Sequence, residues 1–240
     1  EKAAEISKVL EGENRTQQLL LRVWKEGDTF YPGHEGGIHL KNVLETARQI
    51  GSLPNLKVCG VTSFPCLLFN QSTKELYLTP NMDTIIEASE VLSNNGFEIT
   101  QINAPGTTST VTLGLLAKGG ATHVEPGHGM TGTTPAHAFD DLPEIPAILY
   151  LSEISHTYRG YAYFYGGGLY VDPVFQPYPV KALLGRDGEG VLKGRYEVIL
   201  PDFGSIDYYG MLKIESEKVK SGDTVILCFR PQVFHTRARV

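Results

Sequence analysis

Residues 1–135 alternate between short apolar runs and segments with helical spacing, and this alternation constrains the fold more than any other feature of the chain. The predicted strands are residues 19–24, 57–63, 98–103 and 121–124, and the predicted helices lie near residues 40–50, 81–94 and 107–118. Asn81 is expected to cap the second of these helices. Because strands that alternate with helices form parallel sheets, the sequence predicts a parallel α/β domain.

Residues 136–240 have a different texture, with no long helical pattern and with Gly-rich turns between apolar runs. The predicted strands are residues 148–151, 161–164, 196–199 and 224–229. The fold class is therefore α/β followed by all-β, with domains at residues 1–135 and 136–240. A closed eight-stranded α/β barrel takes about 250 residues. The strands of the first domain thus match the second half of such a barrel or a complete open sheet.

Charge, apolar content and cysteine usage exclude several classes of protein. The net charge of −6 disfavours nucleic acid and anionic membrane surfaces as partners. No apolar run approaches the ~18 residues of a membrane span. The cysteines Cys59, Cys66 and Cys228 fit neither a disulfide framework nor a zinc site, which favours the cytoplasm. The chain starts without Met inside a helical pattern, so we expect it to be a fragment.

The segment His123–Gly129 carries the strongest chemical signal. Pro126 cannot donate a ladder hydrogen bond and ends the strand. The N–H groups of Gly127 and its neighbours can approach a ligand closely and bind a phosphate. The carboxylate of Glu125 repels a phosphate, unless the ligand also carries a protonated ring nitrogen. Pyridoxal phosphate (PLP) has both groups, and an acidic partner suits its ring nitrogen.

A metal site is the alternative reading of the same segment. His123 and Glu125 share one face of the predicted strand, and His128 follows in the turn, so these three side chains could bind a metal ion. No second cluster of metal-binding residues accompanies them in the sequence, and we therefore expect no metal.

Six motifs occur in order along the chain: LLLRV (19–23), YPGHEGG (31–37), GVTSFPC (60–66), INAPGTTST (102–110), HVEPGHGMTGTTP (123–135) and GDTVILCFR (222–230). In this combination the chain resembles the alanine racemase-like, fold-type III PLP enzymes, and among them the YhfX-like subgroup. The resemblance covers essentially the whole chain. It implies the second half of a TIM-type (β/α) barrel, followed by an alanine racemase-like β domain.

The resemblance also implies an activity and its partners. PLP is the implied cofactor, an amino acid is the substrate, and a homodimer lets the β domain of one subunit complete the site of the other. Racemisation at the Cα is the implied reaction, with decarboxylation on the same fold and PLP binding without turnover as alternatives. The family's Schiff-base lysine lies in the first half of the barrel, which this chain does not contain. No lysine is therefore assigned, and the chain alone is expected to be inactive.

Several residues take roles from the family's motifs. Glu125 is the implied catalytic partner of the ring nitrogen, with a plain surface glutamate as the alternative. Gly127, His128 and Gly129 would bind the phosphate, although an ordinary turn is also possible; relatives have arginine in place of His128.

Arg22 would pair either with the phenolic oxygen of the cofactor or with a structural carboxylate. Phe64 stands where relatives stack a histidine on the cofactor, or it belongs to the core, and Ser63 is a further possible contact. The remaining cofactor contacts are Asn103, Gly106, Thr107 and Thr108, where Thr107 or Thr108 could equally be a helix cap.

The substrate contacts are expected in two places. His34 and Glu35 lie in a Gly-rich loop after the first predicted strand, and such loops often carry function. Phe234 lies near the place where relatives bring a tyrosine from the neighbouring subunit, although simple packing also explains an aromatic residue there.

Overall fold

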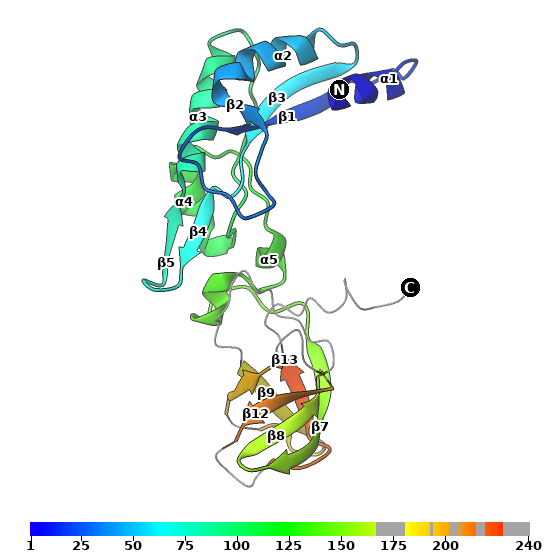
Figure 1. The fold of residues 1–240 in the computed structure, drawn as a ribbon, viewed down its shortest axis with the longest axis vertical. Coiled ribbons are helices and arrows are strands. Elements are labelled where there is room, and N and C mark those ends of the chain that lie inside the picture. Colours follow the sequence, from blue (N-terminus) through cyan, green and yellow to red (C-terminus); the bar gives the residue numbers. More distant parts are fainter. Residues whose placement is uncertain (167–180, 193, 202–205, 207, 215–218, 228–240) are drawn as a thin grey trace. The chain divides into compact units, whose positions relative to one another are not determined.

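The protein is described here by a computed structural model of its 240 residues. The structure describes residues 1–166, 181–192, 194–201, 206, 208–214 and 219–227. The chain divides into two compact units, Glu1–Gly127 and His128–Val240. Figure 1 shows the parallel sheet with its helices in the first unit and the antiparallel strands in the second.

The first unit contains a sheet in which all strands run parallel. Its order is β2-β1-β3-β6. Helix α2 lies between β2 and β3, and α3 lies between β3 and β6, which is the kind of crossover that parallel strands require. The predicted parallel α/β fold is confirmed. The strands are β1 Gln17–Trp24, β2 Ile38–His39, β3 Leu56–Thr62 and β6 Gln101–Asn103; the helices are α1 Lys2–Val9, α2 Val43–Gly51, α3 Pro80–Ser93 and α4 Leu113–Lys118; the 3₁₀ turns are η1 Leu40–Asn42 and η2 Thr110–Thr112. Within the described part of the chain, no helix has the length and apolar character needed to cross a membrane.

The core of the first unit lies between one face of the sheet and helices α2 and α3. Leu21 and Val23 are two residues apart on β1 and therefore point to the same face. They belong to one buried cluster with Val61 of β3 and Ile85 of α3. Each such side chain contributes about 1.5–3 kcal/mol when fully buried. Arg22, which lies between Leu21 and Val23, points to the opposite face.

The predicted strand at residues 121–124 is wrong as an extended strand. Only a single parallel bridge forms, between His123 and Asn103. The Ile102 N–H donates to the Thr122 side-chain oxygen at 2.8 Å instead of to a backbone carbonyl. The Thr122 side chain thus takes up the Ile102 N–H, which a longer strand pairing would need for a backbone hydrogen bond. The pairing therefore stops after one bridge.

An antiparallel hairpin replaces the loop expected between residues 64 and 79. Its strands are β4 Leu67–Asn70 and β5 Glu75–Leu78. The side chain of Asn70 accepts the N–H groups of Ser72 and Thr73 at 2.9 and 3.2 Å, and this turn reverses the chain. Asparagine followed by polar residues between two apolar runs was the signal that could have identified the hairpin.

The second unit is a closed antiparallel barrel. The strands follow the order β9-β11-β12-β8-β7-β13, and β13 also pairs with β9, which closes the ring; β10 adds to β9. The predicted β domain is confirmed, although the sequence missed β9, β10 and β12. The strands are β7 Tyr150–Tyr158, β8 Tyr161–Tyr165, β9 Lys181–Arg186, β10 Gly190–Val191, β11 Tyr196–Ile199, β12 Tyr209–Lys213 and β13 Thr224–Leu227. Short helical segments precede the barrel: α5 Gly127–Met130 and η3 Pro135–Ala138.

Alternating side chains fill the interior of this barrel. Ala162 and Phe164 of β8 are fully buried together with Leu212 of β12. Gly210 faces Phe164, because a Cβ at this position would lie only 2.3 Å from the phenyl ring. The missing side chain therefore makes room for the largest core residue.

Candidate active site

Polar side chains form a row across the carboxyl ends of the parallel strands. In the strand register Arg22 of β1 lies beside Thr62 of β3, and Thr62 lies beside Asn103 of β6. His123 continues the row through its bridge to Asn103. Parallel α/β sheets bind ligands at the carboxyl ends of their strands, so this row marks the candidate site.

Asn103 holds the carboxylate of Glu125. Its Nδ2 donates to Glu125 Oε1 at 2.5 Å and, over a longer distance of 3.5 Å, to Thr62 Oγ1. Asn103 is buried, whereas Glu125 is exposed. A buried amide thus fixes one oxygen of a carboxylate that a ligand can reach.

Arg22 is bound to the loop that follows its own strand. Its Nη2 donates a hydrogen bond to the backbone carbonyl of His34. The sequence left a cofactor oxygen or a carboxylate as the partner, but within the described residues the acceptor is this backbone carbonyl. The Nε of Arg22 is buried there without a hydrogen-bond partner. Gly37 permits the close approach, because a Cβ at this position would lie 2.7 Å from the Arg22 carbonyl oxygen.

Phe64 packs against the same loop, just beyond the end of β3. Its ring centroid lies 5.5 Å from that of Tyr31 and 5.7 Å from that of His34. Phe64 is only half-buried and lies outside the buried core cluster, which favours a site position over a core position. His34 and Glu35 are both exposed in this loop.

Ser63 is buried at the end of β3, and sequence reasoning missed its partner. Ser63 Oγ accepts a hydrogen bond from Asn81 Nδ2 at 3.0 Å. The prediction that Asn81 caps its helix is wrong: Thr79 is the N-cap residue, and the Asn81 side chain is fully buried. Proline at position 80 was the available signal, since proline favours the first helical position and so places the cap at residue 79.

Cys66 lies next to this strand end but does not offer a reactive thiol. Its Sγ donates to the Ser63 carbonyl at 3.2 Å. Burial raises the pKa of Cys66 to about 12. The thiol is therefore protonated near neutral pH, where only a thiolate would be a nucleophile.

The segment after β6 buries its hydroxyl groups. Thr107 and Thr108 are 7% and 1% exposed, and Thr108 Oγ1 has no hydrogen-bond partner within the described residues. Neither threonine caps the following helix, because Ser109 is the N-cap of the 3₁₀ turn at Thr110–Thr112. Gly106 packs against Leu67, whose backbone oxygen would lie 2.5 Å from an added Cβ.

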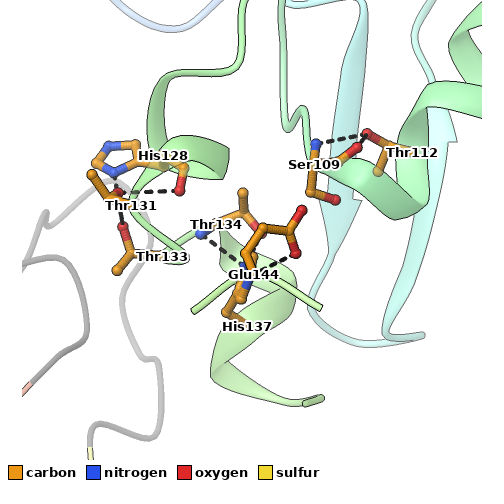
Figure 2. A network of polar contacts seen from close by, with 8 residues as sticks. All are labelled: Ser109, Thr112, His128, Thr131, Thr133, Thr134, His137 and Glu144. Atoms are coloured by element: carbon orange, nitrogen blue, oxygen red, sulfur yellow. Dashed lines mark hydrogen bonds and ion pairs between the residues drawn. The ribbon is translucent and has the colours of Figure 1, made fainter. Parts of the chain in front are cut away.

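Gly127, His128 and Gly129 belong to the four-residue helical turn α5, Gly127–Met130. The Gly127 N–H donates to the Glu125 carbonyl at 3.0 Å. Space around Gly127 is nevertheless open, since an added Cβ would meet no atom within 4 Å. In the second unit, His128 Nδ1 lies 3.2 Å from Thr133 Oγ1 (Figure 2).

The structure does not support the alternative metal site. Across the residues it describes, no three or more His, Cys, Asp or Glu side chains gather in a metal-binding arrangement. His123 instead places Nδ1 2.8 Å from Thr122 Oγ1. Phe234, the remaining predicted contact, lies outside the described residues.

The second unit holds a hollow of about 290 Å³, lined in part by His137 and Glu144. His137 Nδ1 accepts the Thr134 N–H at 3.1 Å and lies 2.6 Å from the Thr134 hydroxyl (Figure 2). The Nε2–H is thereby directed to Glu144 Oε2, 3.2 Å away. Thr134 and His137 form a capping box for η3, so this network has a structural role.

Comparison with known proteins gives matches along the whole chain. Residues 1–135 match the family model described as alanine racemase, N-terminal domain, and residues 149–240 match that of the YhfX-like C-terminal domain. The chain is 40% identical over 246 residues to the uncharacterized protein YhfX of Escherichia coli strain K12. It is covered completely by this match and spans 60% of the length of that relative.

Solved structures share the fold at low sequence identity. D-threonine aldolase from Filomicrobium marinum aligns with a TM-score of 0.60 and 15% identity, over 95% of this chain and 58% of the other. Diaminopimelate decarboxylase from Helicobacter pylori, complexed with L-lysine, aligns with a TM-score of 0.59 and 10% identity, over 96% and 60%. Similarity at this level of identity extends to the fold alone.

Proposed function

Because this chain belongs to the alanine racemase N-terminal domain family, with a YhfX-like C-terminal domain after it, we propose that it is part of a PLP-dependent enzyme that acts at the Cα of an amino acid. We propose racemisation as the reaction. The observation that carries the proposal is the exposed Glu125 carboxylate, held by buried Asn103 at the carboxyl ends of the strands.

Buried polar atoms at the strand ends support a ligand of this kind. Arg22 Nε, Asn103 Oδ1 and Thr108 Oγ1 are buried without hydrogen-bond partners in the described part of the chain. Each unsatisfied buried group costs about 1–3 kcal/mol. The three atoms offer a donor, an acceptor and a hydroxyl, so a bound molecule with several polar atoms could satisfy them. The residues present therefore fit a cofactor with the polarity of PLP.

The proposed roles follow from the chemistry of each group. The carboxylate of Glu125 would keep a proton on the cofactor's ring nitrogen, and Asn103 would orient that carboxylate. Arg22 would direct its free Nε–H towards the phenolic oxygen region. Phe64, half-buried beside His34, would pack on the ring. Bound PLP supplies an electron sink for charge that develops at the substrate Cα.

The phosphate and the substrate take the remaining predicted contacts. Ser63, Thr107 and Thr108, with the open space around Gly127, are the proposed phosphate region of the first unit. His128 and Gly129 belong to the second unit, and their phosphate contacts remain proposals from sequence. The exposed loop residues His34 and Glu35 are the proposed substrate contacts, next to Phe64. Phe234 and a homodimeric arrangement remain proposals from sequence.

Decarboxylation is the second candidate reaction. The observation that favours it is the residue type at position 125, since a glutamate on the ring nitrogen resembles the ornithine decarboxylase branch, whereas alanine racemases have arginine. A protonated ring stabilises a Cα carbanion in either reaction, so Glu125 alone does not distinguish them.

The test uses the full-length protein that carries this chain, saturated with PLP and incubated with a panel of L-amino acids in deuterated water. Exchange at the Cα, followed over time by NMR, together with formation of the D-enantiomer supports racemisation. Release of carbon dioxide supports decarboxylation instead. Bound PLP with neither reaction for any amino acid contradicts the proposed enzyme and leaves a PLP-binding protein, and no PLP binding contradicts the proposal entirely.

A further inference from the structure

Three side chains of helix α3 hold the loop that follows β1, residues 25–37. They are Asn81, Thr84 and Glu87, spaced three residues apart. Residues three apart are neighbours on a helix surface and lie about 60° from each other around its axis. One face of α3 therefore lies along the loop for nearly two turns.

The contacts run in opposite order along the two segments. Asn81 binds Thr29: Oδ1 accepts the Thr29 N–H at 2.8 Å, and Nδ2 donates to the Thr29 carbonyl at 3.1 Å. The Thr84 hydroxyl donates to Asp28 Oδ1 at 2.7 Å.

Closer to the start of the loop, the pairing becomes ionic and more exposed. Lys25 Nζ lies 2.5 Å from Glu87 Oε1, and the Glu87 side chain is 50% exposed. The Lys25 N–H also donates to Asp28 Oδ2 at 2.9 Å, which ties two of the three contacts together. Exposed ion pairs contribute little, about 0–1 kcal/mol. Fixation of the loop therefore depends mainly on the two buried contacts.

Asn81 differs from the other two residues because it also reaches the strand end. Its side chain is fully buried, and Nδ2 donates to Ser63 Oγ at 3.0 Å as well as to the loop. Ser63 precedes Phe64, whose ring packs against His34 of the same loop. A single amide thus joins the backbone of the loop to the end of β3.

We propose that Asn81 is a positioning residue of the candidate site. It fixes the position of the Ser63 hydroxyl relative to the loop of residues 25–37, which contains His34. The proposal rests on the function proposed above for what the site binds. Asn81 itself touches no ligand and acts through Ser63 and Thr29. The contacts of Asn81 thus hold the loop in one position beside the site.

The first test measures amide hydrogen exchange in the ligand-free protein. Asn81→Ala removes both contacts to Thr29, so we expect exchange of loop residues 28–34 to accelerate at least about tenfold. Thr84→Val keeps the shape of the side chain and removes one contact, and we expect a smaller acceleration. Glu87→Gln, on the exposed pair, should change little. Unchanged loop exchange in Asn81→Ala, with α3 still protected, overturns the proposal.

The second test is a double-mutant cycle on PLP affinity, measured by fluorescence titration of the full-length protein. Asn81→Ala and Ser63→Ala should each raise the Kd about tenfold, and the double variant should bind no more weakly than either single one. Ser89→Ala is the matched control, because the Ser89 hydroxyl donates to the carbonyl of Ile86 within α3. Its effect should add independently to that of Asn81→Ala.

Additive effects of Asn81 and Ser63 would overturn the coupling between them. If Asn81→Ala unfolds, Asn81→Ser provides the second variant, since serine is tolerated at helix starts and cannot span both contacts. If the parent protein binds no PLP, the proposed function fails. In that case the hydrogen-exchange experiment still tests whether Asn81 fixes the loop, because it needs no ligand.

Discussion

The two units of this chain end their sheets in different ways. In the second unit β13 pairs with β9, so that the described strands from β9 round to β13 close into an antiparallel ring. In the first unit β1 pairs with β2 only at Val23 and Trp24, so residues 17–22 have a described neighbour on one side only. A closed barrel satisfies its own backbone, whereas an open parallel sheet leaves groups for something else to pair.

The same difference recurs in the arginine side chains. Arg186 in the second unit donates through Nε and Nη2 to both oxygens of Asp223, each at 2.7 Å. Arg22 in the first unit donates to a backbone carbonyl and keeps a buried Nε unsatisfied within the described residues. The pairing in the barrel serves stability, and the incomplete pairing at the strand ends favours a ligand.

The largest expected effect breaks the pair in the barrel. Asp223 is buried, and Asp223→Ala removes the carboxylate that accepts two hydrogen bonds from the mostly buried Arg186. Such a loss typically costs about 3–5 kcal/mol. Urea unfolding with hydrogen exchange resolved by segment should show the loss in β9 and β13. The matched control Glu189→Gln removes an exposed contact of Arg186 and should cost less than about 1 kcal/mol.

Low pH should lower the free energy of unfolding of the second unit. The hydrogen bonds from Arg186 hold the pKa of the Asp223 carboxyl below its ordinary value of 3.8. The ionised pair therefore stabilises the fold fully above that ordinary pKa, and the contribution is lost as pH falls through the lower pKa of the folded state. In the Asp223→Ala variant, the free energy of unfolding should change less over this pH range than in the parent protein. A curve of unchanged shape contradicts the assignment.

The next effect concerns the strand ends. Glu125→Gln keeps an acceptor for Asn103 but removes the negative charge that would hold a proton on the ring nitrogen. We expect Cα exchange in deuterated water to slow by at least about 100-fold, with PLP affinity nearly unchanged. Glu75→Gln, an exposed carboxylate on β5, is the control. An unchanged exchange rate for Glu125→Gln would falsify the role of this carboxylate.

The smallest expected effect compares two glycines of the first unit. Gly106→Ala places a Cβ 2.5 Å from a backbone oxygen of Leu67, so overpacking should cost about 1–3 kcal/mol in urea unfolding. Gly127→Ala meets no atom within 4 Å and should leave stability within about 0.5 kcal/mol. PLP affinity should fall for Gly127→Ala if a ligand approaches there. Equal stability losses would show that both glycines serve packing.

The carboxyl ends of the strands could be predicted from the sequence, because the alternation of apolar residues stops there and polar residues follow. Leu21 and Val23 alternate with Arg22 on β1, and that pattern alone places the arginine on the face away from the helices. The apolar run of β3 likewise ends next to Ser63 and Phe64.

Long-range partners could not be read in the same way. The acceptor for Arg22 is a backbone carbonyl at His34, and any residue type provides such a carbonyl. Asn81 stood at a position where a local cap was the simplest role, but its partners Thr29 and Ser63 lie far along the chain. Sequence patterns report local periodicity, whereas these contacts depend on how separate segments meet.

The three-residue spacing of Asn81, Thr84 and Glu87 limits how this region can change length during evolution. One inserted residue within the first two turns of α3 would rotate everything after it by about 100° around the helix axis. The later contacts would then leave the loop, although every side chain would still be present. A single insertion or deletion here would therefore disrupt several contacts at once, whereas a point substitution removes only the contacts of one residue. An insertion in the turn between β4 and β5, which makes no contact in this series, would leave these three contacts in place.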